Sequence, residues 1–249
     1  LQFSPKHEMS SQILNNGSEL ILFGNYTIST EPIIVWQSID GNNCKAVYRF
    51  GAGYTYVARH IHTLMYSPSV GAWYLTTGDE SSSSEIHWIS GVYDQNATTW
   101  AWTHLISGTE TNQTKAMSLK PVGTKIYWGA DETSGSTYKG IWYCEAADIA
   151  TPANHTRLFY IDEECYSIIV ETNRILFVNH HSVSRNTDLF VYDITTQAIR
   201  QYYLTTNPVV NNDYTLDVGK IIKIRDGEYT MDILSLSNGY VYNTVKFYI

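Results

Sequence analysis

A repeat of about 50 residues constrains the fold of this chain more than any other feature of its sequence. Five segments share one pattern, in which a turn residue precedes an apolar run rich in β-formers and then small or polar residues. They are SELILFGNYT from Ser18, GAWYLTTGDE from Gly71, GTKIYWGADE from Gly123, NRILFVNHHS from Asn173 and GKIIKIRDGE from Gly219. Their fifth residues are 53, 52, 50 and 46 positions apart. Periods of this length are typical of propellers and other repeat architectures.

The flanks of each segment repeat as well. A second strand-like run begins at Ile33, Glu85, Lys139, Asp188 and Thr230, and a third begins at Lys45, Trp100, His155, Ile199 and Val241. A further run precedes the first, for example those from Arg59, Thr114 and Cys165. Four short strands per unit predict an all-β chain, a five-bladed β-propeller with four antiparallel strands per blade. We expect one domain over residues 1–249, with blades at about 10–52, 58–107, 113–161, 164–204 and 213–249.

Composition agrees with this class. The chain has 20 Tyr but only 6 Pro, and Ala- and Leu-rich helical stretches are missing. Its 249 residues are enough for a sizeable core within one all-β domain. Recurring tryptophans in the second and third strands of the units are expected to fill the contacts between blades: Trp36, Trp73, Trp88, Trp128 and Trp142.

Charge and hydropathy argue against nucleic acid and membranes as partners of this chain. The formal charge is -8 with 16 Lys plus Arg, so the chain lacks the excess of positive charge that attracts nucleic acid or an anionic bilayer. No apolar run approaches the roughly 18 residues needed to cross a membrane. The chain begins at Leu1 with a polar stretch, and we expect it to be a processed or excised chain.

Cysteines and glycosylation sequons bear on the compartment. Cys44, Cys144 and Cys165 fit no zinc spacing and are expected to be small buried hydrophobes, with a Cys144–Cys165 disulfide as the open alternative. Asn-x-Ser/Thr triplets, several of them in predicted turns, favour a secreted or surface-displayed glycoprotein. They begin at Asn16, Asn25, Asn96, Asn112 and Asn154.

The stretch RHIHTLMYSPSVGAWYLTTGDE from Arg59, with YWGADE from Tyr127 and LFGNYT from Leu22, resembles sialidase-like proteins with BNR (Asp-box) repeats. Two degenerate Asp-boxes accompany it, SIDGNNCK with Ser38 and Asp40, and DQNATTW with Asp94. In the family such a box forms the hairpin between the third and fourth strands of a blade, where its Asp accepts backbone hydrogen bonds.

The resemblance implies the non-sialidase branch of the family. A sialidase needs three arginines that grip the substrate carboxylate, a Tyr nucleophile with a Glu partner and an Asp acid/base, usually on six blades. This chain has seven arginines, none in an Arg-Ile-Pro context. We therefore expect no sialidase activity.

Ligands of propellers usually bind over one end of the central channel. Polar residues at the starts of first strands and after second strands are therefore the candidate ligand-binding residues: Arg59, His60, His62, Asp79, Asp131, His180 and Asp226. His60 and His62 alternate in a strand and share a face, so with Asp79 they form a candidate site for a divalent cation in the channel. No other cofactor is indicated.

The sequence thus predicts a secreted or surface-exposed propeller that binds carbohydrate or another surface ligand without turning it over. Two alternatives stay open. One is a glycoside hydrolase or lyase that uses carboxylates at the channel rim. The other is a structural subunit of an extracellular assembly or a viral receptor-binding platform, with self-assembly.

Overall fold

The computed structural model describes residues 9–24, 32–51, 53–78, 86–108, 113–130, 137–161, 164–180, 188–203, 216–235 and 241–249. These residues form nineteen strands and two short 3₁₀ helices, η2 (Ala146–Asp148) and η3 (Pro152–Asn154). The strands make five separate sheets, and every strand pair is antiparallel. The chain is therefore all-β, as its repeat predicts.

Within each sheet, neighbouring strands follow one another in the chain. The first sheet contains β1 (Met9–Ile13), β2 (Glu19–Gly24), β3 (Ile33–Ile39) and β4 (Cys44–Phe50). The second contains β5 (His60–Ser67), β6 (Ala72–Gly78), β7 (Ile86–Asp94) and β8 (Thr99–Gly108). The third contains β9 (Ala116–Val122), β10 (Lys125–Ala130), β11 (Ile141–Glu145) and β12 (Thr156–Phe159). The fourth contains β13 (Glu164–Val170), β14 (Arg174–His180), β15 (Asp188–Asp193) and β16 (Ile199–Tyr203).

The fifth sheet departs from the predicted pattern. Among the described residues it has three strands, β17 (Leu216–Arg225), β18 (Glu228–Ser235) and β19 (Val241–Tyr248). The other four repeated segments form second strands, β2, β6, β10 and β14. The run GKIIKI of the fifth segment belongs instead to a first strand, β17. The reason is that no turn precedes this run: Gly219 lies inside β17, at a β-bulge between Val218 and Ile221, so GKIIKI continues the strand that begins at Leu216. A tight turn at Asp226 and Gly227, with a φ of 76° at Gly227 that favours glycine, then reverses the chain into β18.

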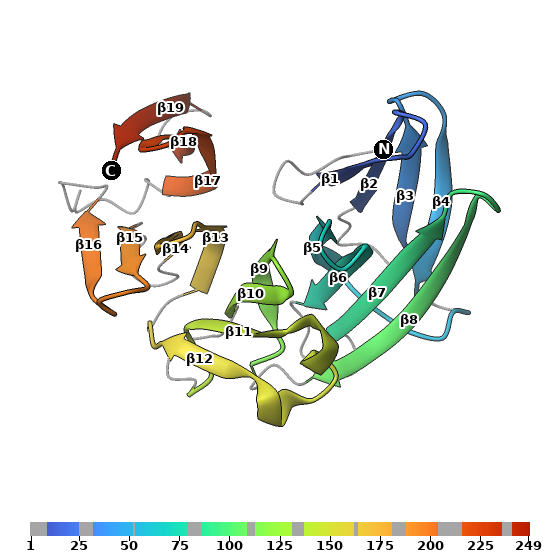
Figure 1. The fold of residues 1–249 in the computed structure, drawn as a ribbon, viewed down its shortest axis with the longest axis horizontal. Coiled ribbons are helices and arrows are strands. Elements are labelled where there is room, and N and C mark those ends of the chain that lie inside the picture. The colour runs from blue at the N-terminus through green and yellow to red at the C-terminus, as the bar shows by residue number, and fades with distance from the viewer. Residues whose placement is uncertain are drawn as a thin grey trace.

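The five sheets follow one another around an arc, with the first and fifth sheets at its two ends (Figure 1). Their first strands lie against one another in succession, β1 against β5, β5 against β9, β9 against β13 and β13 against β17. Buried apolar side chains fill each interface between neighbouring sheets. Trp88 from the second sheet, for example, packs edge to face on Trp128 from the third, with ring centroids 5.2 Å apart and planes at 75°. The arrangement is propeller-like, because no sheet buries both faces alone.

Aspartates organise the hairpins between third and fourth strands. Asp40 accepts a hydrogen bond from the backbone N–H of Glu19 at 2.8 Å. Asp94 accepts two, from the next residues of its own turn at 2.8 and 3.1 Å. Asp193 repeats this geometry between β15 and β16 at 2.9 and 2.8 Å, a third copy that the sequence comparison missed. Asp94 and Asp193 thus stabilise their own hairpins, as predicted for Asp94, whereas Asp40 joins its hairpin to Glu19, the first residue of β2.

Among the described residues, no helix is long and apolar enough to span a lipid bilayer.

A candidate binding cavity between the first two sheets

The predicted rim residues separate in the structure. Asp79 and Asp131 lie outside the described residues, His180 ends β14, and Arg59 is exposed just before β5. Asp226 was placed wrongly, because it follows a first strand and so lies at the opposite end of its sheet from the turns after second strands. There it is 99% exposed and pairs with Lys223 at 2.6 Å.

His60 and His62 do come together, but inside the protein. Their side chains are buried, their Nε2 atoms are 2.9 Å apart, and His62 Nδ1 lies 3.1 Å from the backbone oxygen of Ala116 in β9. A β-bulge between Ile61 and Thr63 allows this, and a side chain on Gly78 would collide with the His62 ring. The pair links the second sheet to the third. No group of three metal-binding side chains occurs in the described part of the chain, and a cation site completed by Asp79 stays a prediction.

The cysteines are all free thiols. Cys144 and Cys165 are buried in different core clusters, and burial raises the pKa of each to about 12. The alternative of a disulfide between them is therefore contradicted. Cys44 is exposed at the start of β4, so the prediction that it is buried was wrong.

Three of the five sequons lie in the described residues. Asn16, Asn96 and Asn154 are exposed in connections between strands, where a glycan would meet solvent. Asn154 donates a side-chain hydrogen bond to Asp148 at 2.9 Å, which a glycan on that amide would disturb. Asn25 and Asn112 lie outside the described residues. Glycosylation stays a prediction.

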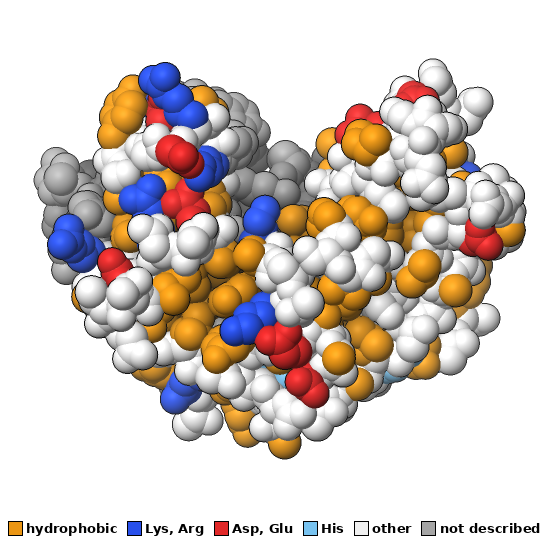
Figure 2. Space-filling model, viewed as in Figure 1, with side chains coloured by type: hydrophobic (Ala, Val, Ile, Leu, Met, Phe, Trp, Pro, Cys, Tyr) orange, Lys and Arg blue, Asp and Glu red, His pale blue; other side chains and the backbone are white. Residues whose placement is uncertain are grey.

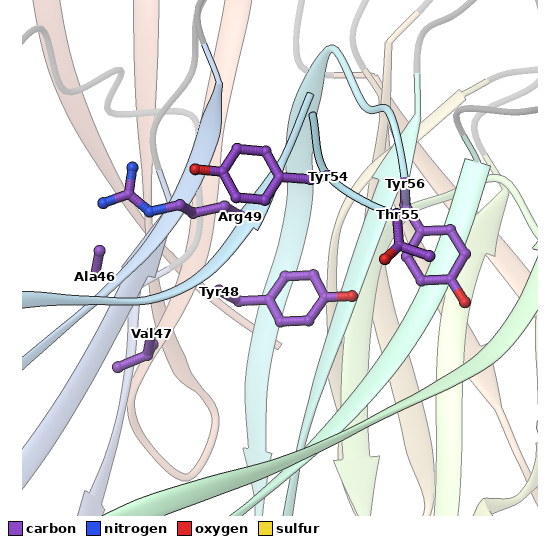
Figure 3. Close-up of a pocket in the computed structure, with 7 residues that line it drawn as sticks. All are labelled: Ala46, Val47, Tyr48, Arg49, Tyr54, Thr55 and Tyr56. Carbon is purple, nitrogen blue, oxygen red and sulfur yellow. The ribbon is translucent and has the colours of Figure 1, made fainter. Parts of the chain in front are cut away.

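A cavity of about 350 Å³ that the sequence did not predict lies along β4, the fourth strand of the first sheet. It is lined by Ala46, Val47, Tyr48, Arg49, Tyr54, Thr55 and Tyr56 (Figure 3). The last three come from the connection to the second sheet. That connection turns back at Gly51, whose φ of 123° favours glycine and whose N–H donates to the backbone oxygen of Tyr56 at 2.9 Å. Tyr54 donates its own N–H to Gly51 at 3.0 Å.

The cavity combines fixed aromatic rings with polar tips. Tyr48 packs between Phe50 and Trp102, at centroid distances of 5.0 and 5.2 Å. Burial, and then the charge interaction with Tyr56, raise the pKa of Tyr48. In Figure 3 its phenol oxygen is directed toward Thr55 and Tyr56, while Tyr54 lies beside Arg49. The lining therefore offers a guanidinium, three phenols and a hydroxyl around apolar ring surface. Such a lining suits a ligand that is rich in hydroxyl groups and has one apolar face.

Two histidines pack against the ring of Tyr56, which lines the cavity. The ring of Tyr56 stacks on His104 with centroids 4.0 Å apart and planes 12° apart. His104 Nε2 lies 3.1 Å from His87 Nδ1, and His87 Nε2 lies 2.8 Å from the carbonyl oxygen of Val57. His87 donates Nε2–H to that carbonyl, and in its neutral form Nδ1 is then the acceptor for Nε2–H of His104. The ring of Tyr56 thus lies against a pair of hydrogen-bonded imidazoles.

This arrangement predicts a pH-dependent stability. Burial, and then the neighbouring His87, lower the pKa of His104 below its ordinary value of 6.5. The unfolded chain therefore binds more protons than the folded one as pH falls through about 6.5, and stability falls with it. We expect the melting temperature to decrease from pH 7.5 to 5.5, and His104→Gln to reduce that decrease. Ser107→Ala, a neutral change in the same cluster, should leave the pH dependence as in the wild type. An unchanged pH dependence in His104→Gln would contradict this reading.

Comparisons with known proteins support the fold only. No protein-family model and no curated protein matches the chain. A chain in the crystal structure of a nidogen/laminin complex is similar, with a TM-score of 0.56 and 12% identity over 88% of this chain and 72% of that chain. A protein from Lactobacillus plantarum has a TM-score of 0.47 and 9% identity over 98% of this chain and 70% of that chain. The similarity to the first of these structures suggests a β-propeller fold, and no BNR or sialidase family matches the chain.

Proposed function

We propose that the chain is a five-bladed β-propeller, secreted or displayed on a surface, that binds carbohydrate in the cavity between its first two sheets. The successive contacts of the first strands and the similarity to a β-propeller chain support the architecture. The hairpins of Asp40 and Asp94 lie between third and fourth strands, as the Asp-box resemblance implies. Exposed sequons support the compartment.

The observation that carries the proposed function is the cavity lining. Tyr54 is 44% exposed and presents ring surface to solvent beside the Arg49 guanidinium. Sugars bind by placing an apolar ring face on an aromatic side chain while their hydroxyl groups exchange hydrogen bonds with polar tips. The packed rings lose little conformational freedom when a ligand arrives.

The same lining supports binding without turnover. Hydrolysis of a glycosidic bond ordinarily requires a pair of carboxyl groups. Among the described residues that line the cavity there is no Asp or Glu. Arg49 and the phenols are suited to hold a sugar by hydrogen bonds and ring contacts.

A glycan array probed with the purified chain tests the proposal. We expect selective retention of a subset of glycans and no released product. Tyr54→Ala removes the exposed stacking surface and should weaken retention by about tenfold, which corresponds to about 1.4 kcal/mol. Tyr248→Ala removes a tyrosine of 67% exposure on β19 and serves as the matched control. Equal retention by both variants, or no retention by the wild type, would overturn the proposal; released product would favour an enzyme.

A further inference from the structure

A second cavity lies in the groove between the third and fourth sheets. It measures about 490 Å³ and is lined by Tyr143, Thr156, Arg157, Leu158, Phe159, Tyr192, Gln197 and Ile199. These residues come from β11 and β12 on one side and from β15, β16 and their connecting turn on the other. Figure 2 shows hydrophobic side chains gathered over this region of the molecule, with charged groups close by.

The aromatic side chains of this second cavity are held in place from behind. Tyr143 stacks on Tyr127 with centroids 5.6 Å apart, and Lys125 Nζ lies 5.0 Å from the Tyr143 ring centroid. Tyr192 is buried and packs on Phe159 at 4.8 Å. The ring surface is therefore formed before any ligand arrives, which lowers the entropic cost of binding.

Polar groups are fixed around the same surface. Arg157 is clamped between Trp142 and Tyr160, its Cζ 5.6 and 5.5 Å from their ring centroids. One of its N–H groups donates to the Thr137 carbonyl at 2.6 Å, and no carboxylate of the described residues forms an ion pair with it. A guanidinium has five N–H donors, so donors remain for a ligand.

Gln197 completes the lining from the β15–β16 turn. It has a φ of 57°, which is uncommon for a residue other than glycine. Asp193 stabilises that turn by accepting two backbone hydrogen bonds. The turn therefore presents an amide, which both donates and accepts hydrogen bonds, at the cavity.

The second cavity shares its chemistry with the first. Each lies along the fourth strand of one sheet, β4 or β12, and each combines an arginine from that strand with tyrosine rings and a threonine hydroxyl. We propose that the groove between the third and fourth sheets is a second carbohydrate-binding site, so that one chain binds oligosaccharide at two places. The class of ligand rests on the proposed function, while the site itself rests on the residues of the second cavity.

Calorimetric titration with three tetrasaccharides, cellotetraose, chitotetraose and tetragalacturonic acid, tests the second site. We expect the wild-type chain to bind two molecules of at least one of them. Tyr54→Ala and Arg157→Gln should each leave one site, and the double variant should leave none. Arg200→Gln changes an exposed arginine of β16 that does not line the cavity, and it should leave both sites. Circular dichroism and melting curves would verify that every variant is folded.

The outcomes separate the two proposals. A stoichiometry of one in the wild type and none in Tyr54→Ala would overturn the second site and support the first. Binding lost in Arg157→Gln but unchanged in Tyr54→Ala would support the second site and overturn the first. If Arg157→Gln binds like the Arg200→Gln control, the second site is overturned. If none of the three sugars binds the wild-type chain, both proposals fail for this class of ligand.

Discussion

Replacing Trp128 with Ala is expected to lower the free energy of unfolding by about 3–5 kcal/mol, because a large ring is removed from a closed interface. The Trp128 side chain is fully buried, and its ring packs against Trp88 and against His155 at 5.0 Å. Its indole N–H also donates to the carbonyl oxygen of Gln113 at 2.7 Å, which Ala would leave without that donor. The change therefore creates a cavity and removes a hydrogen bond at once.

Urea unfolding of Trp128→Ala and two further variants, each compared with the wild type, tests the loss of packing and of the hydrogen bond. Trp128→Phe keeps a six-membered ring but removes the hydrogen bond and leaves a smaller cavity, so it should cost more than about 1 kcal/mol, the contribution of the bond, and less than Trp128→Ala. Val122→Ala, at a partly exposed position of the neighbouring strand, should cost less than about 0.5 kcal/mol. If Trp128→Ala costs no more than Val122→Ala, the interface between the second and third sheets is not the packed core described above.

The repeat predicted most of the fold because each of its parts has a local physical cause. Turn residues separate short apolar runs, and a strand pattern of that kind forms hairpins. Three of the five tryptophans expected between blades are buried, Trp73, Trp88 and Trp128. The last repeat was misaligned because Gly219, read as a turn residue, lies inside β17 at a β-bulge, and its apolar run is therefore part of the first strand of its sheet.

The candidate cavities could not be predicted in the same way, because their shape depends on tertiary contacts: residues 46–49 and 54–56 line the first cavity, and the third and fourth sheets together line the second. Tyr56 lines the first cavity because Gly51 turns the chain back and because His104, 48 residues later in the sequence, supports the ring. The available signal was the short stretch from Arg49 to Tyr56, in which two glycines separate aromatic residues. The candidate residues were predicted at the channel rim because propellers usually bind ligands there. That expectation rests on the fold alone and does not depend on the side chains of this chain.

A network of charged groups joins the fourth and fifth sheets around Glu171. Its side chain is 11% exposed and accepts hydrogen bonds from Arg174 and Lys223 at 2.7 Å each. The buried Tyr229 donates its hydroxyl to the same carboxylate at 2.9 Å, and Arg174 reaches the carbonyl oxygen of Ile249 at 3.1 Å. Removing one charge from such a network leaves its partners desolvated and unpaired.

Glu171→Gln should therefore lower the free energy of unfolding at pH 7 by about 2–4 kcal/mol. Burial alone would raise the pKa of Glu171, but the hydrogen bonds from Lys223, Arg174 and Tyr229 outweigh it and lower the pKa below 4.5. This stability is present above about pH 4.5 and lost as pH falls through the lowered pKa, so the variant should lose less stability on acidification than the wild type. Glu145→Gln changes an exposed carboxylate that accepts a hydrogen bond from the Thr124 hydroxyl, and it is the matched control. If both variants unfold alike at pH 7 and at pH 3.5, the network does not hold the fifth sheet in place.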